Sequence, residues 1–218
     1  MPAPKNCLLA VYADESCLGN GREGSNPGGA GGLIELAHPK SGELVRRDFW
    51  LSEKATTNNR MALRSAIEAL DIASSKQWNC VVVFTSDSRY LVDGMTQWVH
   101  DWARRGWKRK GGEIGNLELW QELVDVAANH RIEWRWVRGH NGHPQNEYAN
   151  MLATRAAARQ DESKGAVESG FEAWMATERE RGRMTLDPSP LPDMRSFREA
   201  RSFREARSLP RGETESLF

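Results

Sequence analysis

The sequence contains few cysteines, no net charge and no long hydrophobic run. Three widely spaced cysteines in 218 residues do not make a disulfide framework or a zinc site, so we expect reduced thiols. No stretch approaches about 18 consecutive apolar residues, which excludes a transmembrane helix and argues against a membrane partner. The first residues lack the basic segment and apolar run of a secretory signal, so we expect a cytoplasmic protein.

Charge is balanced over the whole chain but concentrated locally. The 30 basic residues equal the 30 acidic ones. A balanced total does not exclude nucleic acid, because binding depends on where the charges lie. Residues 104–110 (RRGWKRK) contain five cations and no acid. Such a run is either a solvated face or a phosphate-binding loop.

Hydrophobic patterning predicts an α/β fold over residues 1–160. Apolar runs and alternation predict strands at 7–13, 31–37, 44–51, 80–85 and 132–137. Helical spacing predicts helices at 61–74, 88–104, 117–130 and 145–159. The glycine-rich stretch 19–32 predicts turns. Three successive strands followed by helix-linked strands imply a five-stranded mixed sheet flanked by helices.

Residues 161–218 differ in composition and are predicted to form a flexible C-terminal tail. A helical pattern is followed by a proline-rich stretch at 187–192 and by the hexapeptide RSFREA, which occurs twice in tandem at 195–206. Composition of this kind is typical of a solvated appendage. The alternative is a segment that recruits a protein partner.

Two acidic residues follow buried strands. Asp14 comes after CLLAVYA, and Asp87 comes after CVVVFTS. Carboxylates at the ends of neighbouring strands can share a divalent cation, although an aspartate there also commonly caps the next element.

Several short motifs accompany these acids in a fixed order. They are PGGAG at 27–31, TTNNRM at 56–61, SDSRY at 86–90, WARRGW at 102–107 and VRGHNGHPQNE at 137–147. With these motifs the chain resembles bacterial ribonuclease H of type 1 over residues 7–158. The resemblance implies the ribonuclease H-like fold and a monomer without a small-molecule cofactor.

The resemblance also implies a reaction. The family hydrolyses the RNA strand of an RNA–DNA hybrid with Mg²⁺ or Mn²⁺, and hard carboxylate oxygens suit these ions. Asp14 and Asp87 match two of the four metal-binding carboxylates, and His140 matches a histidine that assists proton transfer. His143 instead organises the start of the following helix.

Two positions depart from the family's metal-binding set. The helix glutamate is Ala62 here, and the last aspartate is Asn150, which offers only a weak ligand. Losing two charges should weaken cation binding, so the resemblance predicts absent or strongly reduced activity. Glu15, Glu68 and Glu147 are possible replacements. Strand alternation predicts that Glu15 points away from Asp14 unless the backbone bulges there. Helical geometry places Glu68 on another face. Glu147 is the best of the three, although the resemblance implies that the family has a glutamate there without using it as a principal ligand.

The residues that the resemblance implies in hybrid binding are more completely present than those it implies in catalysis. Asn20, Asn59 and Arg89 match positions that contact the minor groove, while Thr57 and Asn116 match a pocket for a DNA phosphate. The basic loop and its aromatic neighbours match a protrusion that binds the DNA strand: Trp98, Trp102, Arg104, Arg105, Trp107 and Lys108. Trp120, Trp134 and Trp136 are predicted to be core residues.

Three hypotheses follow. The first is a ribonuclease H with a disabled metal site, either natural or engineered. The second is a non-catalytic module that binds RNA–DNA hybrids, with affinity that falls steeply with salt and depends little on metal. The third, weaker hypothesis is a scaffold whose tail recruits a protein.

Overall fold

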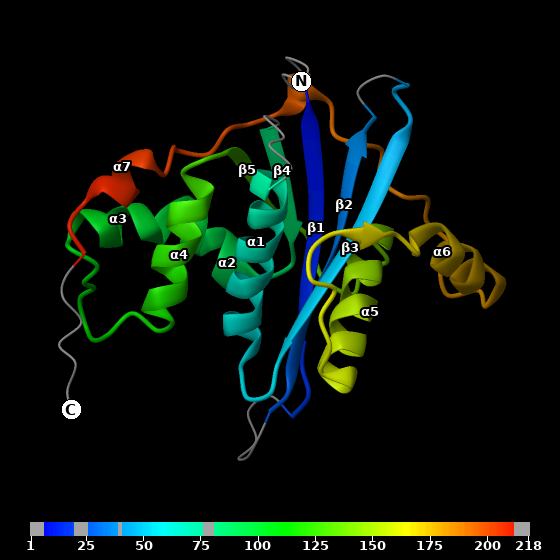
Figure 1. Ribbon diagram of the computed structural model, residues 1–218, viewed down its shortest axis with the longest axis horizontal. Coiled ribbons are helices and arrows are strands. Elements are labelled where there is room, and N and C mark those ends of the chain that lie inside the picture. Colours follow the sequence, from blue (N-terminus) through cyan, green and yellow to red (C-terminus); the bar gives the residue numbers. More distant parts are fainter. Residues whose placement is uncertain (1–6, 20–25, 39–40, 76–80, 212–218) are drawn as a thin grey trace.

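The molecule is built on a six-stranded mixed sheet with helices on both faces (Figure 1). The computed structural model describes residues 7–19, 26–38, 41–75 and 81–211. The strand order is β5-β4-β1-β2-β3-β6. The strands are β1 (Leu8–Cys17), β2 (Gly28–Ala37), β3 (Leu44–Glu53), β4 (Val81–Ser86), β5 (Arg131–Trp136) and β6 (Val167–Glu168). The predicted mixed sheet is confirmed, and the additional strand is the two-residue β6, which pairs with β3.

Helices lie on both faces of the sheet. They are α1 (Asn58–Ser75), α2 (Arg89–Asp93), the π-helix η1 (Gly94–Trp98), α3 (Val99–Arg104), α4 (Leu117–Ala127), α5 (Pro144–Arg159), α6 (Phe171–Glu180), the 3₁₀ turn η2 (Met194–Ser196) and α7 (Arg204–Ser208). α1 and α4 lie on one side of the sheet, and α5 and α6 lie on the other (Figure 1). The single helix predicted at 88–104 is divided by η1. Gly94 is needed there because a Cβ would lie 2.0 Å from the Trp120 ring.

Alternation along β1 assigns its side chains to two cores. Leu9, Val11 and Ala13 belong to the large core shared with α1 and α4. Leu8, Ala10 and Tyr12 belong to a smaller cluster on the opposite face. Continued by one residue each, this alternation directs position 14 to the α5 side and position 15 to the α1 side.

The glycine-rich segment before residue 32 is a strand over its second half, not only turns. β2 begins at Gly28 and pairs with both β1 and β3. A Cβ at Gly29 would lie 2.3 Å from the Ala153 carbonyl oxygen, and one at Gly31 would lie 2.5 Å from the Leu152 Cβ. These glycines are therefore needed because the backbone of α5 lies directly against β2.

The first part of the C-terminal segment packs on the α5 side of the sheet. α6 buries Phe171 and Met175 against Leu33 and Tyr148. The buried Asp48 carboxylate anchors the start of α6: it accepts hydrogen bonds from the Tyr148 hydroxyl at 2.6 Å, the Ser169 hydroxyl at 2.6 Å and the Gly170 N–H at 3.0 Å. The domain boundary at residue 160 remains a prediction. Residues after it add β6 to the edge of the sheet and pack α6 against the α5 side.

The remainder of the segment crosses the molecule to its other side (Figure 1). Leu191, Met194 and Phe197 cover the smaller core cluster on β1 and β4. Phe203 is buried, with its ring stacked on His100 at 4.9 Å between centroids. α7 packs against α3 and α4. Within the described residues, the segment expected to be flexible is thus held by apolar contacts on both faces.

Two further features concern membrane helices and cysteines. Among the described residues, no helix combines the length and apolarity needed to cross a membrane. Cys7 takes part in a disulfide bond, whereas Cys17 is a free thiol. The expectation of reduced thiols is therefore wrong for Cys7.

Candidate functional site

The pairing of β1 with β4 places two acidic residues side by side. The parallel ladder runs from Leu8 opposite Val81 to Ala13 opposite Ser86. β4 ends at Ser86, so Asp87 is the next residue after the last pair and lies beside Asp14. The sequence placed Asp14 at a strand end, but β1 continues to Cys17. Asp14 therefore sits within a strand whose neighbour has already stopped.

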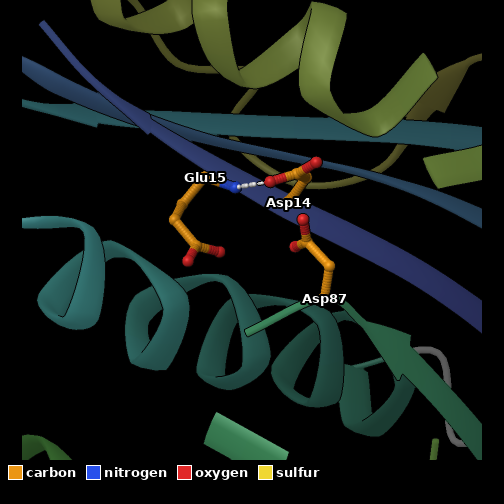
Figure 2. Close-up of side chains that lie close together, drawn as sticks. All are labelled: Asp14, Glu15 and Asp87. Atoms are coloured by element: carbon orange, nitrogen blue, oxygen red, sulfur yellow. Dashed lines mark hydrogen bonds between the residues drawn. The ribbon is translucent and has the colours of Figure 1, made fainter. Parts of the chain in front are cut away.

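A third carboxylate, that of Glu15, joins this pair. One oxygen from each of Asp14, Glu15 and Asp87 lies within 4.8 Å of the others. Figure 2 shows Asp14 and Glu15 on opposite sides of β1, with the Glu15 side chain directed toward α1 and Asp87 reaching between them. The alternation predicted from the sequence holds, but the inference that it keeps the Glu15 carboxylate away from Asp14 is wrong. On the side of β1 where β4 has ended, no strand separates the two faces of the sheet beside Asp14 and Glu15.

Burial and neighbouring acidic charges raise the pKa of all three carboxyl groups. Burial, and next the Asp87 charge, raise the pKa of Asp14 from 3.8 to about 8. Burial, and next the Asp14 and Asp87 charges, raise the pKa of Glu15 well above its usual range. Burial also raises the pKa of Asp87, with a further contribution from Glu147. Buried carboxylates in such proximity favour the binding of protons or of a cation.

Two polar atoms at the cluster have no hydrogen-bond partner within the part of the chain that the structure describes. They are Oε2 of Glu15 and Oδ1 of Asn146, and both are buried. The Nδ2 group of Asn146 donates a hydrogen bond to Oδ2 of Asp14 at 2.9 Å. Unpaired buried oxygens beside three carboxylates fit a hard divalent cation, which prefers oxygen ligands. The residues present therefore suit Mg²⁺ or Mn²⁺ by their chemistry.

The loop between β5 and α5 completes one side of the cluster. A Cβ at Gly139 would lie 2.0 Å from Oδ2 of Asp87, so only glycine fits there without displacing the carboxylate. His140 is exposed, has a φ of 52° and lowers the pKa of Asp87 by its charge. His143 caps α5 by accepting a hydrogen bond from the Asn146 N–H, as expected for a residue that organises the helix start.

Comparison with known proteins identifies the family. The family model for RNase H matches residues 6–158. The chain belongs to the RNase H family. Over 150 residues it is 43% identical to the ribonuclease H of Shewanella halifaxensis (68% of this chain, 85% of the relative). Over 149 residues it is 44% identical to the ribonuclease H of Janthinobacterium sp. strain Marseille (67% of this chain, 94% of the relative).

A solved RNase H structure is similar to almost the whole chain. LC9-RNase H1, described as a type 1 RNase H with the type 2 active-site motif, is 60% identical, with a TM-score of 0.83. The similarity covers 93% of this chain and 94% of that one. It therefore extends into the segment after residue 158, where the family model ends.

The positions that depart from the RNase H pattern lie on α1 and α5. Ala62 is wholly buried on α1. Asn150 is half-buried on α5, four residues after Asn146 and so on the same helix face as the residue that contacts Asp14. Glu147 raises the pKa of both Asp14 and Asp87, which places its charge near the cluster. Glu68 does not belong to the acidic cluster found among the described residues.

Two residues predicted to hold a DNA phosphate of the hybrid share one cavity. Thr57 and Asn116 line a cavity of about 660 Å³ together with Lys54 and Arg60. Arg60 also pairs with Glu53 at 3.0 Å. Asn59 is exposed in the first turn of α1, and Asn20 lies outside the described residues. The structure thus brings together a donor-rich pocket at the start of α1.

The aromatic residues near the basic loop divide into two groups. Trp98 and Trp102 line a second cavity of about 440 Å³ with Tyr90 and Arg109. Arg104, Arg105 and Lys108 are exposed. Trp107 is only 4% exposed and belongs to the large core, so its predicted contact with nucleic acid is not available on this surface.

Trp136 was predicted to be a core residue, and this was wrong. Trp120 and Trp134 are buried, but Trp136 is 38% exposed. Its indole N–H donates to the Asp87 carbonyl oxygen at 3.0 Å, and the Arg89 guanidinium lies 3.6 Å from the ring centroid. Trp136 thus places Arg89 beside the acidic cluster. Sequence reasoning also missed Asn146, whose signal was its four-residue spacing from Asn150.

Proposed function

We propose that this chain is an active ribonuclease H that cleaves the RNA strand of RNA–DNA hybrids. We further propose that Glu15 replaces the helix glutamate that is absent at Ala62. The observation that carries the proposal is the meeting of the Asp14, Glu15 and Asp87 oxygens within 4.8 Å. This proposal replaces the expectation of lost activity, which followed from the changes at Ala62 and Asn150 and from placing Glu15 away from the cluster.

The similar protein LC9-RNase H1 supports a changed metal-binding set. It is described as a type 1 RNase H carrying the type 2 active-site motif. A type 1 fold is therefore compatible with an active-site motif other than its usual one. At 60% identity, this neighbour makes a rearranged motif in the present chain a natural expectation.

In this proposal Asp14, Glu15 and Asp87 hold Mg²⁺ or Mn²⁺, with Asn150 as a weaker ligand. When bound, the ions activate the attacking water and stabilise the departing oxygen. Asn146 orients Asp14 through its 2.9 Å hydrogen bond. His140, on its exposed loop, accepts or delivers a proton at the edge of the site.

The nucleic-acid partner follows from the surrounding surfaces. The cavity at Thr57 and Asn116 would take a phosphate of the DNA strand. The cavity at Trp98 and Trp102, with Arg109, would pack on sugars and neutralise phosphates. Because these contacts reach the backbone and not base edges, we expect little sequence preference.

The test is cleavage of a labelled hybrid in Mg²⁺ and in Mn²⁺. Glu15→Gln keeps the size of the side chain but removes its charge, and we expect a loss of about 100-fold or more. Glu68→Gln is the matched control, because Glu68 is also a half-buried glutamate whose pKa is raised by burial, but it lies outside the acidic cluster.

A double substitution tests the replacement directly. Glu15→Gly with Ala62→Glu restores the arrangement usual in the family, and it should recover much of the activity lost in Glu15→Gly. Unchanged cleavage by Glu15→Gln would refute the role of Glu15. A wild-type chain that binds hybrid without metal but does not cut would instead support a non-catalytic binding module.

A further inference from the structure

A cavity of about 660 Å³ lies between the His140 loop and the segment that follows the RNase H domain. Its lining includes His140 and Glu147 on one side and Trp174, Arg181 and Arg183 on the other. The second group lies beyond residue 158, where the family model ends. The cavity is thus formed jointly by the family domain and by its C-terminal addition.

The domain side of this cavity adjoins the acidic cluster. His140 follows Gly139, whose Cβ would lie 2.0 Å from Oδ2 of Asp87, and Glu147 follows Asn146, which donates a hydrogen bond to Asp14 at 2.9 Å. Glu147 also accepts a hydrogen bond from the Gly142 N–H at 3.3 Å. A ligand that fills the cavity would therefore lie next to whatever the acidic cluster binds.

The far side of the cavity is basic. Arg181 and Arg183 have side chains that are 56% and 69% exposed. Both approach Glu178: Arg181 at 3.0 Å and Arg183 at 3.9 Å. One carboxylate between two guanidinium groups leaves a net positive charge, and each guanidinium carries five donors.

The support for these arginines comes from the apolar face of α6. Phe171, Met175 and Met184 are buried in one cluster with Tyr148 and Leu152 of α5. The Trp174 ring packs on Tyr148 at 5.2 Å between centroids. α6 lies beside α5 in Figure 1. Because Met175 and Met184 are both buried in this cluster, the chain between them, which carries the two arginines, lies against the RNase H domain.

We propose that Arg181 and Arg183 bind a backbone phosphate of the RNA strand adjacent to the phosphate that is cut. The proposal rests on the proposed function, since it assumes that the RNA strand passes the acidic cluster. A single strand carries one charge for about every 3.4 Å of rise, so neighbouring phosphates flank the bond that is cleaved. The acidic cluster suits cations, and the basic side of the neighbouring cavity suits the next phosphate along the same strand.

The experiment measures the affinity of the full-length protein for a fluorescent hybrid, by anisotropy in chelator, at several salt concentrations. R181A/R183A should bind about tenfold more weakly, and the slope of log affinity against log salt should fall by about 1 to 2. R181K/R183K keeps the charge and should retain most of the affinity. R195A/R201A removes the same charge from the same C-terminal segment outside the cavity and should bind as the wild type does.

A second series of hybrids locates the phosphate. A single neutral methylphosphonate linkage is moved one position at a time along an RNA strand carrying 2′-O-methyl at that site. At a position next to the cut site, the neutral linkage should weaken binding by the wild type. At the same position it should not weaken binding by R181A/R183A any further, because that variant has already lost the contact. Equal affinity and equal salt slope for R181A/R183A and the wild type would overturn this inference alone. A wild type that neither binds nor cuts hybrid would overturn the proposed function as well.

Discussion

Replacing Asp14 with asparagine should stabilise the metal-free protein at neutral and alkaline pH. Burial and the Asp87 charge raise the pKa of Asp14 from 3.8 to about 8. A carboxyl group whose pKa is higher in the folded than in the unfolded chain takes up a proton on folding. Its contribution to the free energy of unfolding therefore decreases as pH rises from about 4 to about 8.

The magnitude follows from the pKa. A rise from 3.8 to about 8 corresponds to about 6 kcal/mol at about 1.4 kcal/mol per pH unit. The 2.9 Å hydrogen bond from Asn146 lowers the pKa of Asp14 and is already included in this value. We therefore expect Asp14→Asn to be more stable than the wild type by about 5 kcal/mol near pH 8, where the group is half ionised, and no more stable near pH 4.

Urea unfolding in chelator, repeated between about pH 4 and pH 8, measures this difference. Asp187→Asn is the control, because Asp187 lies on an exposed pair with Arg179 and should show no such pH dependence. Adding Mg²⁺ or Mn²⁺ should then stabilise the wild type more than Asp14→Asn, since binding to the folded state adds to its stability. A wild-type minus variant difference that stays constant with pH would refute the reasoning.

Two further substitutions test how the site and the C-terminal segment are held. Gly139→Ala places a Cβ 2.0 Å from the Asp87 carboxylate, so cleavage should fall about 100-fold. Asp48→Ala removes the acceptor of three hydrogen bonds and should cost about 3 kcal/mol in urea unfolding and expose the segment after residue 160 to protease. Asp187→Ala should cost less than about 1 kcal/mol, and an equal cost would contradict the anchoring role of Asp48.

The order of strands and helices could be predicted from the sequence because it depends on local hydrophobic periodicity. The errors arose where a distant element decides the outcome. Glycines at 28–32 have turn chemistry in isolation, yet Gly29 and Gly31 form a strand because α5 lies against them. Trp136 fits an alternating strand, but β5 is the last strand on its side of the sheet, and Trp136 is its final residue.

The tandem hexapeptide shows the same limit most directly. The two copies have identical sequences, so local propensity assigns them one structure. In the first copy, Phe197 follows a 3₁₀ turn and packs over the cluster on β1 and β4. In the second copy, Phe203 precedes α7 and is buried against His100. Tertiary contacts, and not the hexapeptide itself, decide the conformation of each copy.

The proposed metal-binding set illustrates how a motif can be incomplete while the proposed site has its carboxylates. A motif records which position in the chain carries each carboxylate, but a cation responds only to where the oxygen atoms lie. At the end of β4 the two faces of β1 are no longer separated, so a side chain at position 15 reaches the space between Asp14 and Asp87 from the α1 side. A glutamate at position 62 of α1 would bring a further charge to a region where burial and neighbouring acidic charges already raise three pKa values. In the proposed function, the buried alanine at 62 and the glutamate at 15 are therefore one change, in which the carboxylate has moved from the helix to the strand.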